Sequence, residues 1–138
     1  IAAEGMNMAS ANSCTDITGF GLLGHTYEMA KGSEVSIVID SKSIPIIEGT
    51  IENAKMGLVP AGAYRNKDYL GENVVFDGDI PEYLQDILND PQTSGGLLIS
   101  LPKEKVNELM DYYAENLKTE FSIIGEVTEK QDSYLIVK

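Results

Sequence analysis

Three glycines, Gly19, Gly21 and Gly24, fall within six residues at the start of a stretch that otherwise has helical spacing. A glycine inside a helix costs about 1 kcal/mol relative to alanine, so core packing alone does not explain three of them. Because glycine allows a close approach, the pattern predicts that a phosphate group or another backbone segment lies against this turn. A helix start also attracts anions, since its first N–H groups are free and the helix dipole is positive there.

Polar residues lead into this turn and suggest two roles. Asp16 precedes the glycines, and its carboxylate is suited to hold a hard cation such as Mg²⁺. Acidic and hydroxyl side chains near a helix start also cap free N–H groups, a role open to Asp16 and to Thr18. From the residues alone, helix cap and metal ligand are both open for Asp16.

The composition predicts one domain with an acidic surface. The chain has 138 residues, 43% of them hydrophobic, and a formal net charge of −12. No run of lysine or arginine stands out, which argues against nucleic acid or an anionic membrane as a partner. The single cysteine, Cys14, excludes an internal disulfide and favours a reducing compartment such as the cytoplasm. The chain begins at Ile1 rather than Met, which suggests a piece of a longer protein.

Hydrophobic periodicity predicts alternating helices and strands. Helices are expected over 18–30, 43–57, 79–88 and 102–117, and residues 1–13 have the composition of a helix end. Strands are expected over 34–40, 73–76, 97–101, 121–127 and 134–137. Residues 97–101 are nearly all apolar, as in a buried strand, whereas residues 58–71 suggest turns and a polar connection. This order favours an α+β (α/β) fold over residues 1–138, with a mixed β-sheet packed with helices.

The glycine spacing also matches the dinucleotide-binding fingerprint Gly-x-Gly-x-x-Gly. That site needs a hydrophobic strand directly before the first glycine. Residues 9–16, which precede it here, do not have the pattern of a strand, so a nicotinamide-binding module is disfavoured. A P-loop is excluded because no Gly-Lys-Ser/Thr follows.

Further residues are candidates for chemistry. Cys14 is expected to be a small buried residue, and a nucleophilic pair with His25, the only histidine, is disfavoured. His25 lies in the helical pattern and is expected to be packed or hydrogen-bonded rather than a general base. Residues 93–96 would present N–H groups to an anion or form a tight turn before a strand, and the turn is favoured. Contacts of His25 or Ser94 with a ligand stay open.

Two long motifs resemble a known family. Residues 14–30 resemble the C-terminal domain of selenophosphate synthetase (selenide, water dikinase), in the aminoimidazole ribonucleotide synthetase superfamily. Residues 90–98, Asp-Pro-Gln-Thr-Ser-Gly-Gly-Leu-Leu, resemble the same domain. A weaker match lies at residues 59–62, followed by Arg65 and Asn66. The matches occur in the family's order, and the two long ones separate it from the other members of the superfamily.

The resemblance implies an activity for a larger enzyme. The family converts ATP, selenide and water into selenophosphate, AMP and orthophosphate, and it requires Mg²⁺. Its full enzyme has two domains and is usually a homodimer. The reactive cysteine or selenocysteine, its lysine and the glycine-rich ATP contacts belong to the N-terminal domain, which these residues do not include. The resemblance therefore implies a chain that folds but has no catalytic residue and no activity alone.

The resemblance also assigns roles to residues of the first motif. The Asp of the motif Thr-Asp-x-Thr-Gly-Phe-Gly maps onto Asp16, which it implies to be a Mg²⁺ ligand together with aspartates of the N-terminal domain. The neighbouring residues expected near the ATP phosphates are Thr15, Thr18, Gly19 and Gly21. Two alternatives remain: the C-terminal domain of another ATP-dependent enzyme of the superfamily, and a non-catalytic ligand-binding domain.

Overall fold

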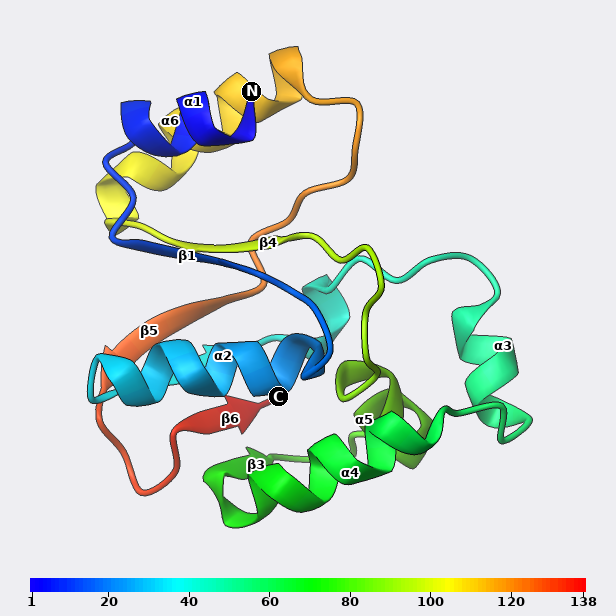
Figure 1. Cartoon of the computed structure of the whole chain (residues 1–138). Helices are drawn as coiled ribbons and strands as arrows, with labels where there is room; N and C mark the ends of the chain where they lie inside the picture. Colours follow the sequence, from blue (N-terminus) through cyan, green and yellow to red (C-terminus); the bar gives the residue numbers. More distant parts are fainter.

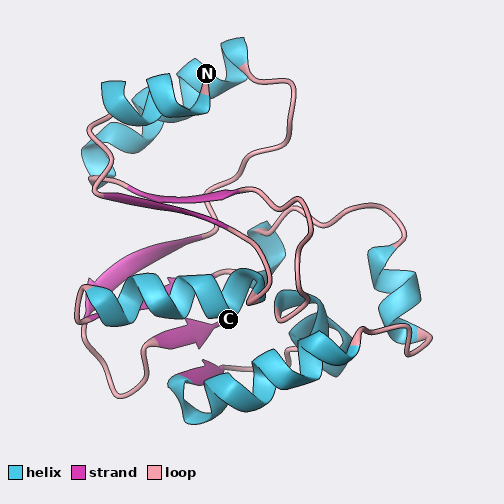
Figure 2. Cartoon of the chain, viewed as in Figure 1, coloured by secondary structure: helices cyan, strands magenta, loops and turns pink.

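Six strands form two separate sheets in the computed structural model, which describes residues 1–138. The strands are β1 (Ser13–Asp16), β2 (Val35–Ile39), β3 (Val74–Phe76), β4 (Leu97–Ser100), β5 (Gly125–Glu129) and β6 (Leu135–Val137). The helices are α1 (Ala2–Met8), α2 (Gly21–Gly32), α3 (Thr50–Lys55), α4 (Ala61–Leu70), α5 (Glu82–Leu88) and α6 (Val106–Asn116). Short 3₁₀ turns lie at Ser41–Ser43, Gly71–Asn73 and Lys103–Lys105. Figure 2 shows helices at the top, across the centre and at the lower right of the view, with strands between them and to the left.

The larger sheet has the order β3-β6-β2-β5 and is mixed. Strand β2 pairs antiparallel with β5 and parallel with β6, which in turn pairs parallel with β3. Helix α2 lies along this sheet (Figure 1). The main core forms between them, from nine buried residues: Leu23, Tyr27, Ala30, Ile37, Ile39, Leu70, Leu88, Leu135 and Val137. Alternate residues of β2 and β6 enter this core, as the period of a strand requires.

The smaller sheet is a two-stranded ribbon of β1 and β4, paired antiparallel. At one end of the ribbon lie α1 and α6, which pack on each other away from the main sheet (Figure 1). Their contact holds a second, smaller core of Ala9, Leu109 and Tyr113. The chain therefore has two hydrophobic cores, joined by the ribbon and by the segment from α6 to β5.

Most of the predicted elements are confirmed, including the mixed sheet packed with helices. The predicted helix over 43–57 is wrong in most of its length, because only α3 is helical there and none of its residues is buried. Gly49 has a φ of +86° directly before α3, and Ile47, predicted on the apolar face, is 80% exposed. Conversely, residues 61–70 form helix α4, which the sequence did not predict because only Ala63 and Leu70 are buried.

Three strand predictions also need correction. The strand expected over 121–127 is β5, which runs from Gly125 to Glu129, so residues 121–124 precede it. Residues 13–16 are a strand, although their side chains lack an apolar pattern, because the main chain pairs with β4. Strand β4 is only half-buried, since its ribbon has no third strand and Leu97 is 48% exposed. None of the helices combines the length and the apolar character that crossing a membrane would require.

Candidate functional site

The two long motifs lie side by side, joined through their main chains. Asp16 is opposite Leu97 at the end of the β1–β4 ribbon. Beyond the ribbon the pairing continues, since the Ile17 N–H donates to the Gly96 carbonyl at 2.9 Å. The Gln92 N–H then donates to the Thr18 carbonyl at 3.0 Å. The fold thus brings residues 14–18 against residues 92–100, far apart in the sequence (Figure 1).

Glycines permit this close contact. A Cβ atom on Gly95 would overlap with the Ile17 carbonyl oxygen. Gly21 has a φ of +70°, and a Cβ there would lie 2.8 Å from the Asn89 carbonyl carbon. At Gly21 the close approach is therefore made by another backbone segment, one of the two possibilities that the glycine pattern left open. Gly19 differs, because a Cβ there would meet nothing within 4 Å.

Helix α4 carries the third, weaker motif to the same place. The Asn66 side-chain amide donates to the Gly19 carbonyl at 3.0 Å and to the Asn89 carbonyl at 2.9 Å. At the start of α4, a Cβ on Gly62 would lie 2.6 Å from Pro91 Cγ. Asn66 therefore holds together the turn before α2 and the end of α5. The sequence did not predict this role, although the match at Arg65–Asn66 marked the residue.

Asp16 is exposed, and its carboxylate has no hydrogen bond or ion pair in the structure. Helix α2 begins five residues later, at Gly21, with Phe20 as its N-cap and no capping side chain. The helix-cap interpretation of Asp16 is therefore wrong, and so is that of Thr18. No group of three or more His, Cys, Asp or Glu side chains in the chain is placed to hold a metal ion. Asp16 is therefore an exposed carboxylate without a partner in this chain.

A hydroxyl, an imidazole and a carboxylate form a chain of hydrogen bonds behind this turn. The Thr18 hydroxyl lies 3.0 Å from His25 Nε2, and His25 Nδ1 lies 3.2 Å from Glu28 Oε2. His25 is only 8% exposed, whereas Thr18 is exposed. The prediction of a packed and hydrogen-bonded histidine is confirmed.

Cys14 is exposed, contrary to the prediction of a buried residue, because β1 has only one neighbouring strand. It lines a cavity of about 210 Å³ between β1 and α2, which His25 and Glu28 also line. The thiol and the imidazole share this cavity but form no hydrogen bond. Desolvation around the sulfur, and then the negative charge of Asp16, raise the pKa of the Cys14 thiol. An activated thiolate needs the opposite environment.

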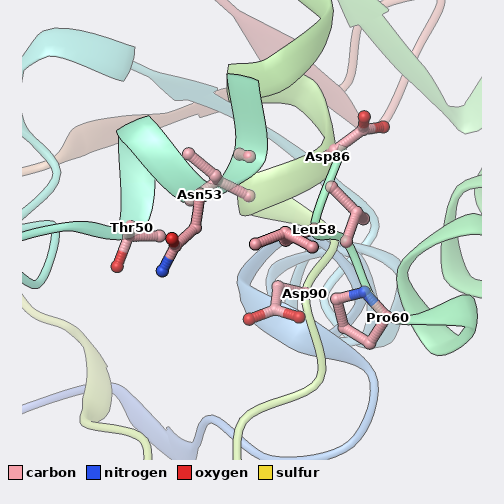
Figure 3. Close-up of a pocket in the computed structure, with 9 residues that line it drawn as sticks. Thr50, Asn53, Leu58, Pro60, Asp86 and Asp90 are labelled. Atoms are coloured by element: carbon pink, nitrogen blue, oxygen red, sulfur yellow. The ribbon is translucent and has the colours of Figure 1, made fainter. Parts of the chain in front are cut away.

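A second cavity, of about 220 Å³, lies between α3 and α5 (Figure 3). Its polar lining comes from Thr50, Asn53, Asp86 and Asp90. Asp86 is buried and ion-paired with Lys67 at 3.4 Å. Asp90 Oδ1 is buried without a hydrogen-bond partner, and desolvation raises the pKa of Asp90. Sequence patterns did not indicate this cavity, since residues distant in the chain form it.

Residues 93–96 form an exposed turn that leads into β4. One of its carbonyls, that of Gly96, accepts the hydrogen bond from Ile17. The predicted tight turn before a strand is confirmed, although that strand is not a buried one. Ser94 is exposed and makes no side-chain hydrogen bond within the chain.

This fold and this arrangement of motifs define a class of protein. Residues 2–138 match the family of the AIR synthase related protein, C-terminal domain, and the chain belongs to that family. Its curated relatives include, more particularly, selenide, water dikinases, so the resemblance noted in the sequence is confirmed.

Three of these relatives show the extent of the similarity. The chain is 54% identical over 136 residues to the selenide, water dikinase of Clostridioides difficile (strain 630), covering 99% of this chain and 39% of the relative. It is 48% identical over 136 residues to selenide, water dikinase 2 of Peptoclostridium acidaminophilum, with the same two coverages. The selenide, water dikinase of Shigella flexneri is 39% identical over 132 residues, covering 96% of this chain and 37% of the relative. The chain thus spans about two fifths of the length of these relatives.

Proposed function

We propose that this chain is the C-terminal domain of a selenide, water dikinase, which makes selenophosphate, AMP and orthophosphate from ATP, selenide and water. The similarity to relatives of that name supports this assignment. The observation that carries it is the joining of the motifs at 14–25 and 90–98 beside an unengaged carboxylate, Asp16.

Asp16 would be one ligand of the Mg²⁺ that accompanies ATP, completed by aspartates of the preceding domain. Its exposure and its lack of hydrogen-bond partners within the chain support this role. Magnesium would neutralise charge on the phosphates, which is the main requirement of phosphoryl transfer. The need is increased by the net charge of −12, which by itself repels a nucleotide.

The turn between β1 and α2 would form part of the wall facing the ATP phosphates. Thr15 and Thr18 would contribute hydroxyl groups there, and Gly19 would allow a close approach, because nothing in this chain occupies the space beside its Cα. Gly21 would act by shaping the turn, since its N–H donates to the Thr18 carbonyl at 3.0 Å.

The isolated chain would fold but show no turnover, since the reactive nucleophile and the glycine-rich ATP contacts would come from the other domain. The raised pKa of Cys14 supports this view, because it keeps the only thiol protonated at neutral pH. We further propose a homodimeric full-length enzyme in the cytoplasm. The free, exposed Cys14 supports a reducing compartment.

Replacing Asp16 in the full-length enzyme tests this proposal. We expect Asp16→Asn to lower selenide-dependent AMP formation more than about 100-fold, beyond the loss typical of residues outside the first ligand sphere. Raising the Mg²⁺ concentration should restore part of the activity. Since the side chain supports no contact within the chain, the thermal midpoint should stay within about 1 °C of the unchanged protein, as for other exposed substitutions.

The matched control is Asp132→Asn, which makes the same charge change on an exposed turn between β5 and β6. It should leave AMP formation and its Mg²⁺ dependence unchanged. Near-normal activity of Asp16→Asn would contradict the metal-ligand role. ATP turnover that is independent of selenide would instead favour another ATP-dependent enzyme of the same superfamily.

A further inference from the structure

The contacts from Thr18 through His25 to Glu28 favour one tautomer of the neutral imidazole. Glu28 Oε2 is a carboxylate oxygen, which only accepts hydrogen bonds. At 3.2 Å from His25 Nδ1, it requires the proton on that nitrogen. In the neutral ring Nε2 is then unprotonated and is an acceptor. In that neutral tautomer, the Thr18 hydroxyl, 3.0 Å from Nε2, donates its proton inward to His25.

This arrangement determines what Thr18 offers to its surroundings. A hydroxyl has one proton and two acceptor lone pairs. With the proton directed to the buried His25, only the lone pairs of Thr18 Oγ1 face outward. Thr18 is exposed, as is Asp16, and the residue between them, Ile17, is buried. Two acceptor oxygens thus lie close together in the sequence on the exposed side of the turn.

We propose that Thr18 Oγ1 is a second oxygen ligand for the divalent cation held by Asp16, and that His25 and Glu28 are its positioning residues. This inference rests on the proposed function of Asp16. Hard cations such as Mg²⁺ take neutral hydroxyl oxygens together with carboxylates, as at the Ser/Thr of P-loops. A hydroxyl that already donates to a fixed acceptor is oriented before the cation binds, so less ordering is needed on binding.

The burial of His25 fits a positioning role. The His25 side chain is 10% exposed, whereas the Glu28 side chain is 54% exposed and reaches the ring from the solvent side of α2. The spacing of 25 and 28 places both on one face of the helix. Phe20 contacts the ring as well, with the ring centroids 5.6 Å apart. The imidazole is therefore held from several sides.

The test measures Mn²⁺ binding to the full-length enzyme by electron paramagnetic resonance, with a non-hydrolysable ATP analogue present. We expect Thr18→Val, which keeps the shape but removes the hydroxyl, to weaken Mn²⁺ affinity about tenfold, the lower range for residues that tune a metal site. Thr18→Ser, which keeps the hydroxyl, should bind within about twofold of the unchanged protein.

A matched pair at position 25 tests the positioning role. His25→Gln can place an acceptor oxygen near the place of Nε2, whereas His25→Asn reaches only the place of Nδ1. We expect His25→Asn to weaken Mn²⁺ binding several-fold and His25→Gln to retain most of it. Thermal melting of both variants shows how much protein is folded, so that binding can be compared per folded molecule. We expect the two variants to lose similar stability.

Asp16→Asn is measured beside them, so that the two proposals are tested separately. If Asp16→Asn weakens Mn²⁺ binding but Thr18→Val does not, the ligand role of Thr18 is overturned and that of Asp16 stands. A rise in KM for ATP with unchanged Mn²⁺ affinity would assign the hydroxyl to a phosphate and also overturn it. Equal behaviour of His25→Asn and His25→Gln overturns the positioning role. Unchanged Mn²⁺ binding by Asp16→Asn overturns both proposals.

Discussion

The glycines of the site do not all have the same structural role. Gly21 and Gly95 are required by the fold, since a side chain at either would collide with the backbone of another segment. Gly19 has open space beside it, and its backbone conformation suits any residue. Nothing within this chain therefore requires glycine at position 19, and the space beside it is free for the bound group or neighbouring domain proposed above.

This difference leads to a prediction for Gly19→Ala in the full-length enzyme. The thermal midpoint should not fall, because the added methyl group meets nothing within the chain. AMP formation should fall by about tenfold or more if the methyl group displaces a phosphate or the other domain, as small displacements in an active site do. Gly32→Ala is the control, since its Cβ also has open space but lies at the far end of α2. Normal activity of Gly19→Ala would contradict a close approach at this turn.

Asp90 gives a pH-dependent prediction. Desolvation raises its pKa in the folded state, and the hydrogen bond from Gln92 only partly offsets this. A raised folded pKa means that its contribution to stability is full below the unfolded pKa, near pH 4, and is lost as pH rises through the folded pKa. The charged carboxylate therefore lowers stability at neutral pH.

We expect Asp90→Asn to raise the thermal midpoint slightly at pH 7. The difference from the unchanged protein should shrink as the pH is lowered toward about 4, where Asp90 itself becomes protonated. Melting curves at a series of pH values measure this, with Asp132→Asn as the control for charge alone. A lower midpoint at pH 7 would mean that the carboxylate is paired in solution, and would contradict the unpartnered Oδ1.

Among the elements, those with a strong apolar period could be predicted from the sequence. Helices α2 and α6 and strands β2 and β6 bury regular stripes, and the sequence indicated each of them. Strand β1 could not be predicted, because main-chain pairing with β4 rather than its side chains makes it a strand. Helix α4 was missed because only Ala63 and Leu70 in it are buried, which leaves no regular apolar stripe.

The candidate site was predictable only in part for the same physical reason. Asp16 could be found from a motif that is continuous in the sequence. The meeting of 14–18 with 92–100 depends on the register of β1 and β4, which the sequence did not specify. The role of His25 depends on its contacts with Thr18 and Glu28. Helical spacing suggested the contact with Glu28, three residues later, but not the contact with Thr18. The sequence patterns did not show which distant segments of the chain lie together in space.

The acidic charge of the chain affects how a nucleotide would approach the candidate site. With 22 acidic and 10 basic side chains, the chain repels anions at long range. A nucleotide would therefore approach more readily as its Mg²⁺ complex, which carries less negative charge. At short range, two features of the site favour a phosphate group. They are the start of α2, where the helix dipole is positive, and the open space beside Gly19.

The two hydrophobic cores predict two levels of local stability. The main core has nine buried residues, whereas the core between α1 and α6 has three. Units with fewer buried contacts open more readily without global unfolding. In the full-length protein, we expect amide hydrogens of α1 and α6 to exchange with solvent faster than those of α2, β2 and β6. Hydrogen-exchange mass spectrometry measures this directly.

A pair of core substitutions sharpens the test. Leu109→Ala should cost about 2–5 kcal/mol within the small core and accelerate exchange in α1 and α6 only. Leu23→Ala, the same change in the main core, should accelerate exchange in α2 and the large sheet, and in α1 and α6 as well. We expect this asymmetry because the β1–β4 ribbon joins the two cores. The small core can open while the large core stays folded. If Leu109→Ala accelerated exchange equally everywhere, the chain would be a single cooperative unit, and Asp16, at the ribbon's end, would depend on both cores.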